Sequence, residues 1–178
     1  MEINMNLPNK LTLIRIILVP VMMLLTLSGH FYIGLLVFCI ASVTDFFDGY
    51  IARKYDLVTS FGKIMDPLAD KILVFGALLC FIEMDYINSW SVIVILAREF
   101  FVTGMRVVAV SKGKVIAASW WGKIKTNVQL FAIIAAFITF GIGTNVEMVG
   151  KCAIYFAALF TIASWVAYIF ENKEIFKD

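Results

Sequence analysis

The stretch that decides the fold runs from residue 16 to residue 44 and reads IILVPVMMLLTLSGHFYIGLLVFCIASVT. It contains one histidine, His30, and no aspartate, glutamate, lysine or arginine. One helical crossing of a bilayer takes about 20 apolar residues. The stretch is longer than that, so it holds the end of one membrane-spanning helix and most of the next. We place the turn between the two helices at the polar break formed by residues 27–30.

The composition of the whole chain agrees with a membrane protein. Of the 178 residues, 62% are apolar and 16% are charged, whereas a soluble domain has about half and about a quarter. A chain of this length has too little interior to bury so much apolar surface in water. The net charge of +2 is not the footprint of a nucleic-acid-binding protein, so we expect no nucleic-acid partner. The three widely spaced cysteines fit buried apolar positions: Cys39, Cys80 and Cys152.

Apolar runs of similar length recur along the rest of the chain. Residues 126–146 and 152–170 are almost free of charge, and residues 67–81 and 87–110 are apolar with a few charged interruptions. The first ten residues do not resemble a cleaved signal peptide, so we expect the first span to be retained. We predict an all-α integral membrane protein, a single membrane domain over residues 1–178. Its six transmembrane helices are predicted at 10–28, 31–53, 64–82, 88–109, 124–143 and 149–170.

The distribution of basic residues predicts the orientation of these helices. Between the first and second spans there is no lysine or arginine, and the segment between the third and fourth holds only the acidic Glu83 and Asp85. Most lysines and arginines lie at the opposite ends of the spans. The positive-inside rule then places both termini in the cytoplasm. We expect a multi-pass protein of the cell (inner) membrane whose functional site faces the cytoplasm.

Four aspartates interrupt the apolar pattern near that cytoplasmic side. Asp45 and Asp48 lie three residues apart in the second span, and Asp66 and Asp70 lie four apart at the start of the third, so each pair shares a helix face. A short connection makes the two spans antiparallel neighbours. Four carboxylates in a medium of low dielectric constant repel each other unless protons or cations neutralise them. Two divalent cations would cancel the charge, and all-oxygen ligands favour Mg²⁺ or Mn²⁺.

Structural roles remain an alternative for each aspartate. Asp66 precedes Pro67, which is a common pair at the start of a helix. Asp45 and Asp48 have three candidate ion-pair partners nearby: Arg53, Lys54 and Lys71. Charges within a membrane are costly and usually functional, which favours a site over four separate structural roles.

The spacing of these residues resembles that of a known family. Asp45, Asp48, Gly49, Ala52, Arg53, Gly62, Asp66 and Asp70 match the signature of the CDP-alcohol phosphotransferases. The similarity extends over nearly the whole chain, and within the family the chain looks most like the phosphatidylglycerophosphate synthases, on segments 8–15, 66–71, 97–106 and 122–126. This resemblance implies an enzyme that converts CDP-diacylglycerol and glycerol 3-phosphate to phosphatidylglycerophosphate and CMP. It also implies a homodimer in the lipid bilayer.

The resemblance also implies roles for the signature residues. The four aspartates would hold two metal ions, and Asp70, the last of them, would be the base that deprotonates the acceptor hydroxyl. Small side chains beside the carboxylates let a ligand approach the backbone. The expected CDP-diacylglycerol contacts are Gly49, Ala52, Arg53 and Gly62, with Asn9 and Thr12 from the first span.

An acceptor that carries a phosphate needs cations. Arg98 and Arg106 lie eight residues apart in the fourth span, about two turns, and we expect them on one face. Lys123 and Lys125 open the fifth span. An arginine fork and a lysine suit a dianionic phosphate. The alternative pairs Arg98 with Glu99 or with a signature aspartate and leaves the lysines as interfacial anchors.

Two other functions compete with this reading. A sibling enzyme of the same family would use another alcohol, such as inositol phosphate. A transporter of divalent cations would also need buried carboxylates, but the sequence has no inverted repeat of broken helices, and cations on the same side would then have no role.

Overall fold

The computed structural model describes residues 6–55, 59–113 and 120–173, with the side chains of all of these except 46–53, 60, 63 and 144. All regular structure in this part of the chain is helical, which confirms the all-α prediction. The six helices are α1 (Leu7–Leu27), α2 (Phe31–Lys54), α3 (Ser60–Glu83), α4 (Ser89–Ser111), α5 (Trp120–Ile142) and α6 (Thr144–Glu171).

The predicted helices end within two residues of the observed ends, but four of the six begin three to five residues earlier than predicted. Each missed first turn contains polar residues, which hydropathy alone assigns to loops. Asn6 caps α1 by accepting a hydrogen bond from the backbone N–H of Asn9 at 3.1 Å, and Thr59 caps α3 by accepting one from Gly62 at 3.0 Å. Pro67 therefore lies inside α3, and the alternative that Asp66 caps this helix is wrong.

Judged by length and composition, three of the described helical segments are long and apolar enough to cross a membrane. These segments are Leu7–Leu27, Trp120–Ile142 and Asn145–Glu171. An all-helical chain with such segments has the architecture expected of a membrane protein.

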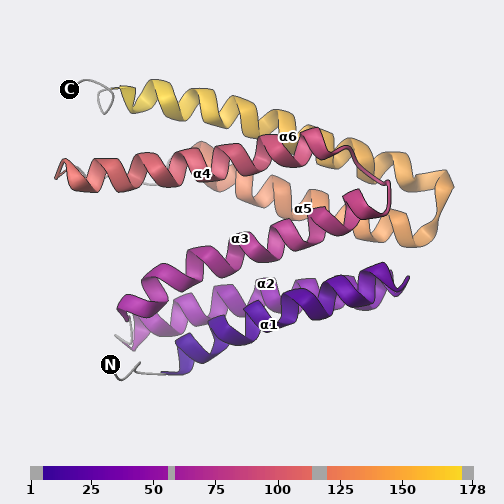
Figure 1. The fold of residues 1–178 in the computed structure, drawn as a ribbon, viewed down its shortest axis with the longest axis horizontal. Helices are drawn as coiled ribbons and strands as arrows, with labels where there is room; N and C mark the ends of the chain where they lie inside the picture. Colours follow the sequence, from indigo (N-terminus) through magenta and orange to yellow (C-terminus); the bar gives the residue numbers. More distant parts are fainter. Residues whose placement is uncertain (1–5, 56–58, 114–119, 174–178) are drawn as a thin grey trace. The chain divides into compact units, whose positions relative to one another are not determined.

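The chain divides into two compact units, Met1–Met84 and Asp85–Asp178, while the predicted single domain stays a prediction. In the first unit α1 packs against both α2 and α3 (Figure 1). Gly76 allows α3 to pack closely against α1. A methyl group at this position would lie only 2.7 Å from Cγ1 of Val19. The buried stripe of α1 is apolar at Val19 and Met22 and polar nearer its N-terminus.

In the second unit α6 packs against α5 and α4 (Figure 1). Gly143 joins α5 to α6 with φ of 113°, a backbone conformation that favours glycine. The Tyr86 hydroxyl donates a hydrogen bond to the carbonyl of Glu147 at 2.9 Å and lies 2.9 Å from Oγ1 of Thr139. Burial raises the pKa of the Tyr86 phenol, which keeps its proton available for this bond. Tyr86 thus ties the segment before α4 to α5 and α6.

Candidate active site

A row of polar side chains lies on one buried face of α1. Asn9, Thr12 and Arg15 follow each other at three-residue intervals, and each is at most 1% exposed. This spacing places them on one side of the helix. A buried polar row at the end of an apolar helix requires polar partners on the neighbouring helices, and α2 and α3 supply these partners.

Asp66 on α3 accepts a hydrogen bond from the middle residue of this row. Oγ1 of Thr12 lies 2.6 Å from Oδ1 of Asp66, across 54 residues of sequence. The same hydroxyl lies 3.1 Å from the backbone carbonyl of Pro8. A hydroxyl has one hydrogen to donate, and the 2.6 Å separation is that of a charge-assisted bond to a carboxylate. Asp66 is therefore oriented by α1.

Asp45 on α2 forms an ion pair with the last residue of the row. Nη1 of Arg15 donates to Oδ1 of Asp45. The Arg15 side chain is fully buried, whereas the Asp45 side chain remains 40% exposed. Arg15 is not among the partners expected for Asp45, which were Arg53, Lys54 and Lys71. The missed signal was the three-residue spacing that puts Arg15 in line with Asn9 and Thr12.

Gly62 lies where α1 meets the start of α3. The Thr59 hydroxyl donates to Oδ1 of Asn9 at 2.9 Å. A methyl group on Gly62 would lie 3.1 Å from that Oδ1, 3.3 Å from Oγ1 of Thr59 and 3.6 Å from Oδ2 of Asp66. The absence of a side chain at Gly62, which is itself buried, therefore lets Asn9 and Thr59 pack closely against the backbone beside the Asp66 carboxylate. The expected contact of Gly62 with CDP-diacylglycerol stays a prediction.

The remaining signature residues divide into two sets. Asp70 is half-buried and lies one turn after Asp66 on α3. Asp48, Gly49, Ala52 and Arg53 belong to α2, but their side chains lie outside the described part of the structure. Among the described side chains, no group of three or more His, Cys, Asp or Glu residues is arranged to hold a metal ion. The four-aspartate metal site therefore stays a prediction, with Asp45 and Asp66 both oriented from α1.

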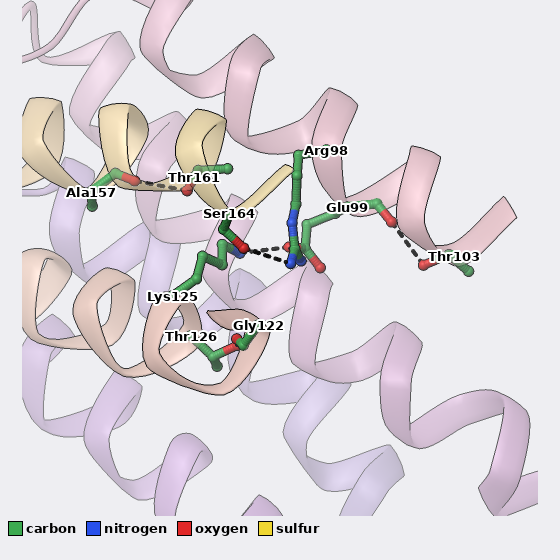
Figure 2. A network of polar contacts seen from close by, with 9 residues as sticks. All are labelled: Arg98, Glu99, Thr103, Gly122, Lys125, Thr126, Ala157, Thr161 and Ser164. Atoms are coloured by element: carbon green, nitrogen blue, oxygen red, sulfur yellow. Dashed lines mark hydrogen bonds and ion pairs between the residues drawn. The ribbon is translucent and has the colours of Figure 1, made fainter. Parts of the chain in front are cut away.

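The second unit contains a separate buried cluster of charged residues (Figure 2). Glu99 on α4 accepts through Oε1 from Nη1 of Arg98 at 2.9 Å and from Nζ of Lys125 on α5 at 2.5 Å. Nη2 of Arg98 also donates to Oγ of Ser164 on α6 at 3.2 Å. Arg98 and Lys125 are 6% and 3% exposed. One carboxylate thus holds an arginine and a lysine from two different helices.

The other two predicted acceptor cations lie outside this cluster. Arg106 and Lys123 are exposed. The expectation that Arg106 shares a face with Arg98 is wrong, because an eight-residue step in a helix of 3.6 residues per turn ends about 80° beyond two full turns. The buried positions of α4 after Arg98 are instead Val102, Met105 and Ala109. The alternative pairing of Arg98 with Glu99 is confirmed, and sequence reasoning missed Ser164 because an isolated serine in an apolar run carries no signal.

Known proteins resemble this chain over nearly its full length. The sequence model of the CDP-alcohol phosphatidyltransferase family matches residues 5–170. A Bacillus subtilis protein named CDP-diacylglycerol–glycerol-3-phosphate 3-phosphatidyltransferase is 42% identical over 97% of both chains. Proteins of the same name from Rickettsia prowazekii and Shigella flexneri are 41% and 35% identical, over 99% and 92% of this chain and 100% and 93% of their own. With the signature residues in place on α2 and α3, the chain belongs to the CDP-alcohol phosphatidyltransferase family.

Proposed function

We propose that this chain transfers the phosphatidyl group of CDP-diacylglycerol to glycerol 3-phosphate, giving phosphatidylglycerophosphate and CMP. The observation that carries the proposal is the near-full-length similarity, at 35–42% identity, to relatives that bear the name of this reaction. In this transfer an acceptor hydroxyl oxygen bonds to the lipid phosphorus, the pyrophosphate bond to CMP breaks, and the hydroxyl proton leaves.

The residues of the first unit suit the electrophilic side of this reaction. Asp45 and Asp66 offer hard oxygen ligands whose carboxylates are held by protein donors, and Asp48 and Asp70 would complete the set. This donor chemistry fits Mg²⁺ or Mn²⁺. When bound, two such ions would polarise the pyrophosphate and stabilise the leaving CMP. Asp70, one turn beyond Asp66, is the candidate base for the acceptor hydroxyl.

The nucleotide-lipid contacts are proposed around the same carboxylates. Gly62 lies beside Asp66, and Gly49, Ala52 and Arg53 complete the signature on α2. Asn9 and Thr12, the other two predicted contacts, are buried and bonded within the protein. Their positions support an indirect role in the site.

The acceptor phosphate is proposed to bind cations of the second unit. Arg98 and Lys125 are held together by Glu99 on two helices, and a prearranged arginine and lysine suit a phosphate. Arg106 and Lys123 are further candidates whose exposure leaves them available to a soluble substrate.

The membrane environment of the enzyme is proposed from the sequence. We propose that all six helices span the cell (inner) membrane, with both termini and the active site on the cytoplasmic side, where glycerol 3-phosphate is supplied. The basic residues at the predicted cytoplasmic ends support this orientation. A homodimer is proposed from the family resemblance.

CMP release from CDP-diacylglycerol by the purified protein in detergent tests the function. We expect release with Mg²⁺ and glycerol 3-phosphate, and background release with inositol phosphate or without an acceptor. Release with inositol phosphate alone would assign the chain to a sibling reaction. No release with any acceptor, together with uptake of Mn²⁺ into liposomes that contain the protein, would favour a transporter.

A further inference from the structure

We propose that Thr12 and Arg15 of α1 are positioning residues that set the orientation of the Asp66 and Asp45 carboxylates for a divalent cation. This inference rests on the metal chemistry of the proposed function. It assigns to α1 a role other than contact with the nucleotide, and it includes Arg15, which lies outside the signature on α2 and α3.

The bond from Thr12 selects one oxygen of Asp66. The hydroxyl donates to Oδ1 at 2.6 Å from a fully buried position. The second oxygen, Oδ2, is the one that a methyl group on Gly62 would approach at 3.6 Å. Oδ2 therefore lies on the Gly62 side of the carboxylate, while Oδ1 accepts from the Thr12 hydroxyl. Thr12 thus orients Asp66 to present Oδ2 to a cation.

Arg15 orients the Asp45 carboxylate in a similar way. Its side chain is fully buried and reaches Oδ1 of Asp45 from the protein interior, while 40% of the Asp45 side chain remains exposed. Arg15 makes this contact through Nη1, and the rigid, planar guanidinium fork of an arginine restricts the orientation of a carboxylate more than the flexible ammonium of a lysine does. The arginine also supplies a positive charge that limits repulsion among the carboxylates before a cation binds.

Asn9 ties this row to the beginning of α3. Its Oδ1 accepts from the hydroxyl of Thr59, which also caps α3 through the N–H of Gly62. The register of α3 against α1 is therefore set within two turns of Asp66. Residues that orient metal ligands through hydrogen bonds typically change metal affinity about tenfold to a hundredfold when removed.

The first unit contains a matched control on the same helix. Thr26 is fully buried on α1 like Thr12, but its hydroxyl donates to the backbone carbonyl of Met22 at 2.7 Å. Thr12→Val and Thr26→Val make the same chemical change in the same helix. Only Thr12→Val removes a bond to a signature carboxylate.

The test is a titration of the intact protein in detergent with Mn²⁺. Binding is measured as the loss of the electron paramagnetic resonance signal of the free ion. We expect Thr12→Val to weaken Mn²⁺ binding about tenfold to a hundredfold, Thr12→Ser to retain most of the affinity, and Thr26→Val to bind like the parent. Arg15→Lys, which keeps the charge and loses the fork, is expected to weaken binding as well, and it tests the proposal if Thr12→Val does not fold.

Several outcomes would overturn the inference. These are parent-like Mn²⁺ binding by both Thr12→Val and Arg15→Lys, equal weakening by Thr12→Val and Thr26→Val, or a parent protein that binds no Mn²⁺. The proposed function fails separately: if the parent binds Mn²⁺ and Thr12→Val weakens binding, but CDP-diacylglycerol and glycerol 3-phosphate yield no CMP, the positioning role stands and the proposed reaction does not.

Discussion

The two units of the chain differ in which charged side chains they bury. In Met1–Met84 the acids Asp45 and Asp66 are partly exposed, and their partners Arg15 and Thr12 are buried behind them. In Asp85–Asp178 the cations Arg98 and Lys125 are buried and share one acid, Glu99.

The difference shows which groups each unit leaves available. A partly exposed carboxylate whose orientation is fixed by a buried donor is suited to the cation proposed above. A buried arginine and lysine that share a carboxylate oxygen have already lost their hydration, and this arrangement is stable only while the acid remains. The first unit is thus built to present acids, and the second to hold cations in a defined arrangement. Four substitutions test this difference between the units.

The largest effect is expected at the acids of the first unit. Asp66→Asn keeps the size of the side chain but removes a charged metal ligand, so CMP release should fall to background. The measurement is turnover at saturating Mg²⁺, with Asp85→Asn, outside the helices, as the control. Normal turnover of Asp66→Asn would refute the metal-ligand role of this residue.

Removal of the shared acid in the second unit is expected to be the largest effect on stability. Glu99→Ala leaves Arg98 and Lys125 without their common partner, and breaking a buried pair in this way costs about 3–5 kcal/mol of unfolding free energy. The control is Glu147→Ala, which breaks a more exposed Glu147–Lys151 pair at 3.5 Å and should cost about 0.5 kcal/mol or less. Denaturant titration in detergent measures both changes, and equal losses would contradict the contrast drawn here.

The cations of the second unit should affect the acceptor more than the nucleotide lipid. A charged hydrogen bond to phosphate contributes about 1.5–3 kcal/mol, so Lys125→Met should raise the KM for glycerol 3-phosphate about tenfold to a hundredfold. The KM for CDP-diacylglycerol should change little. Lys123→Met is the comparison, because Lys123 is exposed and separate from the cluster. A larger effect at Lys123, or equal changes in both KM values, would move the acceptor phosphate away from Lys125.

The smallest expected effect concerns helix packing in the second unit. A methyl group on Gly150 would lie 2.1 Å from Oγ1 of Thr139 and 2.2 Å from the Tyr86 hydroxyl. Gly150→Ala should therefore lower the unfolding free energy by about 1–3 kcal/mol. Gly104→Ala has open space around it and should raise the unfolding free energy by up to about 1 kcal/mol. Thermal unfolding in detergent gives both signs, and stabilisation by both substitutions would refute the close packing at Gly150.

Sequence patterns alone predict the helices and the acidic helix faces of the first unit. Apolar runs of about 20 residues predict helices because only a helix satisfies its own backbone hydrogen bonds in an apolar medium. The spacing of Asp45, Asp48, Asp66 and Asp70 predicts two acidic helix faces because the helical period relates residues of one helix. These local rules placed most helix ends within two residues, and they failed at polar first turns such as the one capped by Thr59.

The partners across helices were decided only by the tertiary structure. Thr12 is 54 residues from Asp66 and Arg15 is 30 residues from Asp45, and no periodicity of one helix predicts how far a neighbouring helix is shifted or rotated. That shift depends on packing, such as the approach of α3 to α1 at Gly76. The partners of Glu99 show the same limit. The pairing with its neighbour Arg98 is evident in the sequence, but the contact with Lys125 exists only because α4 and α5 bring the two side chains together.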